Sequence, residues 1–288
     1  MFYPRRIFFI TFLLAVAASL LAGWHMLQMR QDALAYAHAS GKNTLILVER
    51  DLHRDLDVHK QTLQTLANVI AGSATPELSR QVLQELVQGH VASSMMAGTL
   101  VVTDANGHLL VDLNHVSETH KDLSRREYFR VPRANPSRLF LSHPFMPPYP
   151  DPSPSIALSR AVQDKDGKVL GVVAAIKELR HLETFVRELD LGKRGVVSIR
   201  LLDGTVLARW PSAPTYERED EGRMFRNFVA SGEKESFRQH PKGSGAYWRG
   251  YRRVGDYPVT VSVELYREEI FQTWAERTWI TSGLLLAI

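Results

Sequence analysis

The sequence predicts an α+β fold in which one long N-terminal helix carries two successive antiparallel sheet modules between two apolar chain ends. Between Leu45 and Ile70 the apolar residues recur in steps of three and four, as on one face of a helix. Beyond Gly98 they form short runs separated by Asn-Gly or Asp-Gly pairs, which are typical of hairpin turns. Such turns are too short for the crossovers that parallel strands need, so the sheets are expected to be antiparallel.

The composition narrows the class of protein. Of the 288 residues, 44% are hydrophobic and 23% are charged, which is ordinary for a globular protein. Cysteine is absent, so a disulfide framework, a thiolate zinc site and a cysteine nucleophile are excluded. The net charge of +4 is modest, and local arginine clusters are more informative than the total.

The first apolar segment predicts a transmembrane helix at residues 7–28. It contains no Asp, Glu, Lys or Arg between Ile7 and Leu27, and as a helix it would be about 31 Å long, enough to cross a bilayer core. Arg5 and Arg6 precede it, which places residues 1–6 in the cytoplasm and the following domain outside. A cleaved signal peptide is the alternative, and it also exports the domain.

The last segment, residues 267–288, is expected to form an exit helix and the start of a second membrane helix. Residues 278–288 are apolar and uncharged, but about eleven residues are too few to cross a bilayer. Trp274 and Trp279 stand where an interfacial aromatic belt would place them. The alternative is a C-terminal helix that packs on the domain.

A stalk helix is predicted at residues 29–74, continuous with the membrane helix and charged on its outer face. A helix of this length needs a partner, which is either its own domain or a second copy in a parallel homodimer. Thr75 is expected to cap a further short helix. The apolar stripe of the stalk consists of Leu45, Val48, Leu52, Leu56, Leu63, Leu66 and Ile70.

Two sheet modules follow, a membrane-distal one at 75–190 and a membrane-proximal one at 191–266. Each contains an Asn-Gly or Asp-Gly hairpin, a helical segment and further strands, and the two match in architecture without repeating in sequence. The expected strands lie at 99–103, 108–113, 156–163, 168–177, 195–202, 205–209, 236–239, 246–254 and 258–265, and the expected helices at 178–189 and 221–231.

Several segments, in this order, resemble the double Cache family of bacterial sensor domains, in which two PAS-like modules stand on a long helix between two membrane helices. The resemblance covers most of residues 30–277. It is carried by residues 122–130 (DLSRREYFR), 148–151 (PYPD), 156–159 (IALS), 167–174 (GKVLGVVA), 203–209 (DGTVLAR) and 255–261 (GDYPVTV).

The resemblance implies an extracytoplasmic ligand sensor of a bacterial inner-membrane receptor. The segments of the second module resemble sensors found ahead of diguanylate cyclases, so that output is expected beyond this chain, with a histidine kinase or a chemoreceptor as alternatives. The amino-acid-binding subgroup has an aspartate after the valine-rich strand. This sequence has Ala175, Ile176 and Lys177 there, which argues against an amino-acid ligand.

A basic cluster suggests the chemistry of the ligand. Between residues 121 and 138, six Lys and Arg side chains accompany only two acidic ones. A guanidinium in a closed pocket can bind a carboxylate through two parallel hydrogen bonds, so we expect a small anionic ligand held by Arg126 with help from Arg130. The alternative is a solvated face. The remaining expected site residues, implied by the resemblance or able to supply apolar walls and a hydroxyl, are Tyr128, Phe129, Phe145, Tyr149 and Asp151.

No metal, cofactor, catalytic residue or nucleic acid is expected. Asp51, Asp55 and His59 lie four apart on one helix face, but a solvated charged face explains them better than a metal site. Arg249 and its neighbours alternate with aromatic residues, and an exported strand with one polar face explains this better than nucleic-acid binding. Linear enzyme motifs are absent, and a membrane-tethered enzyme or plain binding protein stays as an alternative of a different class.

Overall fold

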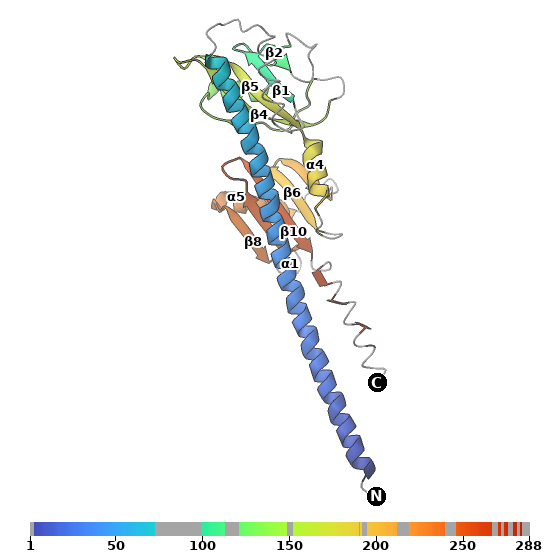
Figure 1. Ribbon diagram of the computed structural model, residues 1–288. Coiled ribbons are helices and arrows are strands. Elements are labelled where there is room, and N and C mark those ends of the chain that lie inside the picture. Colours follow the sequence, from blue (N-terminus) through green and yellow to red (C-terminus); the bar gives the residue numbers. More distant parts are fainter. Residues whose placement is uncertain are drawn as a thin grey trace.

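The computed structural model shows a single long helix with two sheets arranged one after the other along it (Figure 1). It describes residues 3–72, 99–112, 121–148, 152–189, 191, 195–211, 219–239 and 246–266, and isolated positions between 270 and 283. The predicted cap at Thr75 lies outside the described residues.

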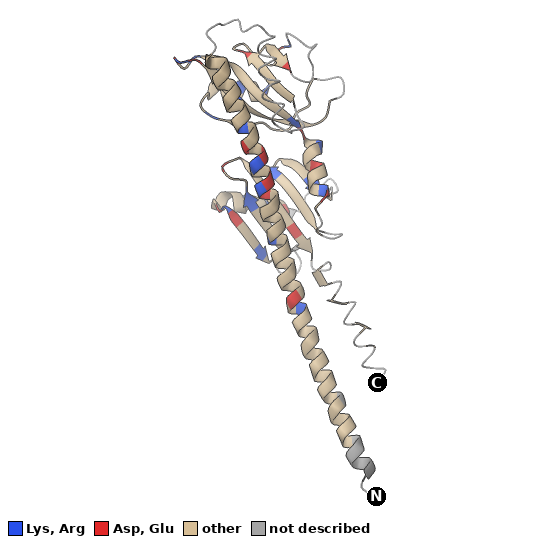
Figure 2. Ribbon diagram, in the orientation of Figure 1, with Lys and Arg blue, Asp and Glu red and all other residues tan. Residues whose placement is uncertain are grey.

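Helix α1 (Tyr3–Gly72) contains 70 residues and is therefore about 105 Å long. Within the described residues it is the one helix long and apolar enough to cross a membrane, and its most apolar window has a mean hydropathy of 1.9 and no buried residue. Figure 2 shows that charged side chains occur on α1 mainly where it passes the sheets. The long N-terminal helix that the sequence predicts is thus confirmed, with an apolar end that projects beyond both sheets (Figure 1).

The predicted second membrane helix falls almost wholly outside the described residues. Of the exit segment, Trp274 donates a hydrogen bond from its indole nitrogen to the backbone oxygen of Met26, at 2.9 Å. The guanidinium of Arg30 lies over the ring of Phe271, 5.5 Å from its centroid. The chain therefore returns to the side of α1 after the second sheet.

The first sheet is antiparallel, with the strand order β2-β1-β5-β4-β3. The predicted Asn-Gly turn connects β1 and β2. Gly107 has a φ of +94°, which favours glycine, and the Asp104 carboxylate accepts hydrogen bonds from the backbone N–H groups of Asn106 and His108. Its strands are β1 (Thr99–Asp104), β2 (Leu109–Asp112), β3 (Phe140–Leu141), β4 (Ser155–Gln163) and β5 (Val169–Glu178).

The second sheet has the order β7-β6-β10-β9-β8. When strands are counted from the start of each sheet, both sheets have the same order, so the expected architectural match of the two modules is confirmed. Its strands are β6 (Val196–Leu201), β7 (Val206–Trp210), β8 (Glu235–Gln239), β9 (Ala246–Arg253) and β10 (Val259–Tyr266).

Helices cover both faces of each sheet. Helix α1 packs against β4 and β5 of the first sheet and against β9 and β10 of the second, where alternate strand residues form one continuous apolar core. The opposite faces are covered by α3 (Glu127–Ala134) in the first sheet and by α5 (Glu219–Ser231) in the second, and α4 (Leu179–Arg187) connects the two. We call the first sheet with α3 the first module, and the second sheet with α5 the second module.

Candidate functional site

The expected ligand site lies on the face of the first sheet that α1 does not cover. Helix α3 places Tyr128 and Phe129 there, and both are fully buried against Val101, Ala157 and other side chains of that face. Residues Leu100 and Val102, one position away along β1, belong instead to the core beneath α1. Because side chains alternate along a strand, the first sheet has two different faces. We call the one under α3 the site face, and the other packs on α1.

Arg126, Tyr128 and Phe145 are brought together at the start of α3. Arg126 is the residue before the first helical turn, and its guanidinium donates a hydrogen bond to the backbone oxygen of Met146, at 3.2 Å. The same group lies over the ring of Phe145, 5.7 Å from its centroid. The Phe145 ring in turn contacts Tyr128, with ring centroids 5.2 Å apart. One cation and two aromatic rings thus form a small cluster.

A buried carboxylate that sequence reasoning missed faces this cluster. Asp112 ends β2 directly opposite Val101, and cross-strand partners share a face, so its side chain belongs to the site face. It is 6% exposed and accepts a hydrogen bond from the hydroxyl of Thr99, at 2.7 Å. Its signal in the sequence is weak, because an acidic residue at the end of an apolar strand normally indicates only the beginning of a loop.

The hydroxyl of Tyr128 remains protonated over the physiological range. Burial raises the pKa of Tyr128 to about 12, Arg126 opposes the rise, and the charge of Asp112 adds to it. A protonated phenol can donate one hydrogen bond as well as accept. The site face therefore combines a guanidinium, a hydroxyl and a carboxylate in a largely apolar setting.

The remaining expected site residues do not join the cluster of Arg126, Tyr128 and Phe145. Arg125 and Arg130 are exposed, which agrees with the alternative of a solvated face for these two. Lys121, also in the basic cluster, donates to the backbone oxygen of Pro148. Tyr149 and Asp151 lie outside the described residues.

Lys177, which stands near the position of the aspartate of the amino-acid-binding subgroup, does not belong to the site. Ile176 faces the site, and Lys177, the next residue of β5, points to α1, where its ammonium lies 2.6 Å from the carboxylate of Asp55. His59 lies beside this pair, with Nδ1 2.8 Å from the backbone oxygen of Asp55. The expectation of a solvated face is therefore wrong for Asp55 and His59, whose side chains are 18% and 15% exposed.

Metal binding finds no support in the part of the chain that the structure describes, because no group of three or more His, Cys, Asp or Glu residues is placed to hold an ion. Arg249 is buried beneath α5, with Nε 3.0 Å from the carboxylate of Glu264. Arg253 donates to the backbone oxygen of Val229 on α5, at 2.8 Å. The alternating arginines of β9 thus serve internal packing.

No family model matches the chain, and no curated protein matches it. Solved structures do share its fold. The extracellular domain of rpHK1S-Z16, described as a histidine kinase, superposes with a TM-score of 0.65 at 23% identity, covering 84% of this chain and 99% of that domain. The chain has the fold of an extracellular sensor domain.

Two chemoreceptor domains also share the fold of this chain at low sequence identity. The ligand-binding domain of Campylobacter jejuni Tlp3 with 4-methylisoleucine has a TM-score of 0.61 at 11% identity and covers 83% of this chain and 94% of that one. The ligand-binding domain of Pseudomonas fluorescens CtaA with L-isoleucine has a TM-score of 0.58 at 15% identity, covering 85% and 97%. At the level of fold, these likenesses agree with the resemblance to double Cache sensors.

Proposed function

We propose that the chain is the extracytoplasmic ligand-sensing part of a bacterial inner-membrane receptor, with its N-terminus in the cytoplasm and both modules in the periplasm. One observation carries this proposal: an unburied apolar helix leads directly into a fold that spans 99% of a solved extracellular sensor domain. The apolar end of α1 crosses the bilayer, so the first module is membrane-distal and the second is membrane-proximal.

The output is a histidine kinase or a chemoreceptor signalling domain. The solved structures named above come from these two classes, and they favour them over the diguanylate cyclase that the sequence analysis placed first. Trp274, which returns the chain to α1, leads toward this output. The receptor acts as a parallel homodimer, in which a second copy covers the part of α1 outside the bilayer, where Tyr36 and Leu47 are 77% and 59% exposed.

The ligand is a small carboxylate. Because Lys177 points away from the site, the sequence argument against an amino acid no longer applies, and an α-amino acid fits the site better than a plain anion. Arg126 supplies a cation for the carboxylate, and Asp112 supplies a buried anion for an ammonium group. The charges of Arg126 and Asp112 act on the pKa of Tyr128 in opposite directions, so the phenol is within reach of both. Chemoreceptor domains of the same fold are solved with 4-methylisoleucine and with L-isoleucine, which supports testing amino acids first.

Titration calorimetry of the full chain in nanodiscs, against amino acids and the matching organic acids without the amino group, tests this assignment. An amino-acid ligand should lose at least about tenfold in affinity in both Arg126→Ala and Asp112→Asn, since each removes a charged hydrogen-bond partner. A plain carboxylate should respond to Arg126→Ala alone.

Arg125→Ala is the matched control, because Arg125 is exposed and adjacent in sequence. Binding that survives Arg126→Ala unchanged would place the ligand elsewhere. A reporter fused at the Asp164–Gly167 turn checks the topology independently, since this turn is exposed between β4 and β5. Cytoplasmic reporter activity there would contradict the receptor assignment.

A further inference from the structure

The buried carboxylate of Asp112 stands at the margin of the first sheet. Strand β2 is an edge strand of that sheet, and Asp112 is its last residue. The pairing with Val101 of β1 fixes the place of its backbone, whereas the direction of its side chain depends on further contacts. That direction matters for binding, because a hydrogen bond weakens steeply as its angle departs from linear.

The hydroxyl of Thr99 makes such a contact. Thr99 is the first residue of β1, two positions before Val101, so it lies diagonally across from Asp112 on the same face of the sheet. Its Oγ1 is 2.7 Å from a carboxylate oxygen of Asp112, and both residues are 6% exposed. Because an ionised carboxylate can only accept, the hydroxyl is the donor, and such charge-assisted bonds are strong.

Threonine on β1 is well suited to hold a neighbouring side chain in one place. Strand β1 lies inside the sheet, paired with β2 on one side and with β5 on the other. The branched Cβ of threonine also restricts the rotation of its side chain. The hydroxyl of Thr99 is therefore a more rigid support than the end of the edge strand that carries Asp112.

Thr99 lies at the same end of the sheet as the cation of the site. Its cross-strand partner on β5 is Ile176, which pairs in turn with Ala157 of β4. Phe145, whose ring contacts the Arg126 guanidinium, forms a bridge with the first residue of β4, two positions before Ala157. A row across the strands thus connects the guanidinium to the carboxylate that Thr99 supports.

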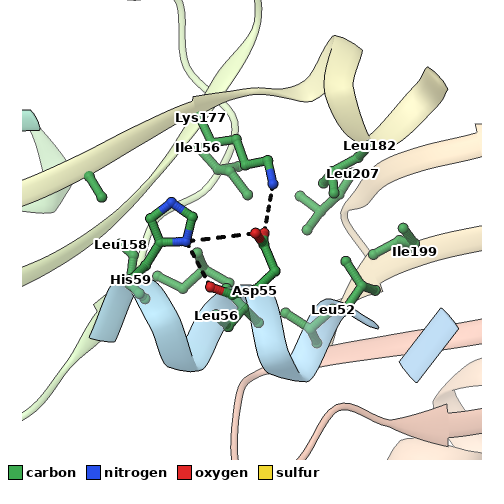
Figure 3. A pocket seen from close by; sticks show the side chains of 13 residues that line it. Leu52, Asp55, Leu56, His59, Ile156, Leu158, Lys177, Leu182, Ile199 and Leu207 are labelled. Atoms are coloured by element: carbon green, nitrogen blue, oxygen red, sulfur yellow. Dashed lines mark hydrogen bonds and ion pairs between the residues drawn. The ribbon is translucent and has the colours of Figure 1, made fainter. Parts of the chain in front are cut away.

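The opposite face of this sheet end is already occupied by an ion pair. Figure 3 shows Lys177, the residue after Ile176, extending to Asp55 of α1. Of the buried acidic residues that the structure describes, Asp112 is the one that belongs to the first module. Its orientation therefore decides where an ammonium group can bind on the site face.

We propose that Thr99 is a positioning residue of the amino-acid site, whose hydroxyl holds the Asp112 carboxylate in the direction in which it receives the ammonium group of the ligand. This role rests on the proposed function. It makes the preference for an amino acid over the matching plain acid depend on Thr99, because a binding group that is already oriented loses less freedom when the ligand arrives.

Titration calorimetry of the full chain in nanodiscs tests this role. The probes are the standard amino acids and, for each one that binds, the acid without the amino group, such as L-isoleucine and 3-methylpentanoate. Thr99→Val removes the hydroxyl and keeps the shape of the side chain. It should weaken amino-acid binding about five- to tenfold and change the binding of the plain acid by less than about twofold.

Thr99→Ser restores the hydroxyl, and its amino-acid affinity should return to within about twofold of the wild type. In the Asp112→Asn background, Thr99→Val should cause no further loss, because the two side chains act as one unit. Thermal unfolding reports whether each variant folds, and Thr99→Ala replaces Thr99→Val if that variant does not.

Thr103→Val is the matched control. Thr103 is buried on the same face of the same strand, about 13 Å away, and its hydroxyl donates to the backbone oxygen of Val172, at 3.4 Å. Its loss removes a buried hydroxyl without touching Asp112. The ratio between the affinities for the amino acid and for the plain acid should therefore stay as in the wild type.

The outcomes separate this role from the proposed function. Amino-acid binding that needs Asp112 but is unchanged in Thr99→Val would overturn the role of Thr99 alone. So would an equal loss for both probes, which indicates a merely structural effect, or a loss that Thr99→Ser does not restore. A wild-type chain that binds none of the amino acids would overturn both proposals. A selective loss in Thr99→Val, restored in Thr99→Ser, would support the role.

Discussion

His143 and Asp203 connect the two modules, with Nε2 of the imidazole 2.6 Å from the Asp203 carboxylate. The other ring nitrogen of His143 lies 2.9 Å from the carboxylate of Glu127 at the start of α3. The pKa of His143 is raised, first by the hydrogen bond to Asp203 and then by the one to Glu127. A single imidazole thus bridges a carboxylate of the first module and one of the second.

This bridge should make the coupling between the modules depend on pH. Because the pKa of His143 is raised in the folded state, its stabilisation is complete below the ordinary value of about 6.5 and is lost as the pH rises through the raised value. Partial burial raises the pKa of Asp203, but hydrogen bonds from the Thr205 backbone and from His143 outweigh this and lower it. Its contribution is therefore lost only as the pH falls through that lowered value, below about 3.8.

A double-mutant cycle of His143→Asn and Asp203→Asn, read by urea unfolding, measures the coupling. We expect less than about 1 kcal/mol at pH 5.5, since both side chains are about half exposed, and a value near zero at pH 9. Equal coupling energies at both pH values would show that the coupling does not depend on the charge of His143.

Removing Lys177 should loosen α1 from the first sheet. Lys177→Met leaves the Asp55 carboxylate without its ammonium partner in a mostly buried place, and we expect a loss of about 1–3 kcal/mol in the free energy of unfolding. The double variant with Asp55→Leu should recover most of it, because apolar replacement of both partners is often neutral. A double variant no more stable than the single one would contradict this account.

Gly250 allows α1 to approach the second sheet closely. A Cβ atom at this position would lie 2.3 Å from Phe237 and 3.0 Å from Leu45 of α1, so Gly250→Ala should force them apart and cost about 1–3 kcal/mol. Gly72→Ala is the control, because nothing lies within 4 Å of the place that its methyl group would take, and alanine favours helix. Thermal unfolding that ranks the two variants in the opposite order would contradict the packing argument.

The buried pair beneath α5 should be among the most sensitive sites of the second module. The Nε of Arg249 lies 3.0 Å from Glu264, close enough for an ion pair although outside hydrogen-bond geometry, and the two side chains are 2% and 3% exposed. Glu264→Gln should cost about 3–5 kcal/mol, because it leaves a buried guanidinium uncompensated. Glu233→Gln, which breaks an exposed pair with Arg238, should change stability by less than about 0.5 kcal/mol.

Local signals predicted much of the fold. The stalk periodicity, the turns at Gly107 and Gly167 and the strands they join depend on neighbours in sequence, and the structure contains all of them. Helix α3 and strand β3 were missed for local reasons as well. Pro132 stands inside α3 and argues against a helix, and β3 has only two residues, Phe140 and Leu141.

The candidate site was less predictable, because faces and partners are set by distant contacts. Lys177 and Ile176 are neighbours in sequence, and only the packing of α1 decides which of them faces the ligand. Asp112 becomes part of the site only through its register with Val101. Asp55 was expected to be solvated because its partner, Lys177, is 122 positions away and no sequence period links them.

The contact between Trp274 and Met26 has a mechanical consequence. The chain enters the two modules along α1 and leaves them beside the same helix, near Met26. The entering and leaving segments run in opposite directions there. The second sheet leads directly into the exit segment through β10, and it packs against α1 through β9 and β10. A shift of the second sheet along α1 would therefore have to carry the exit segment past α1 by the same distance.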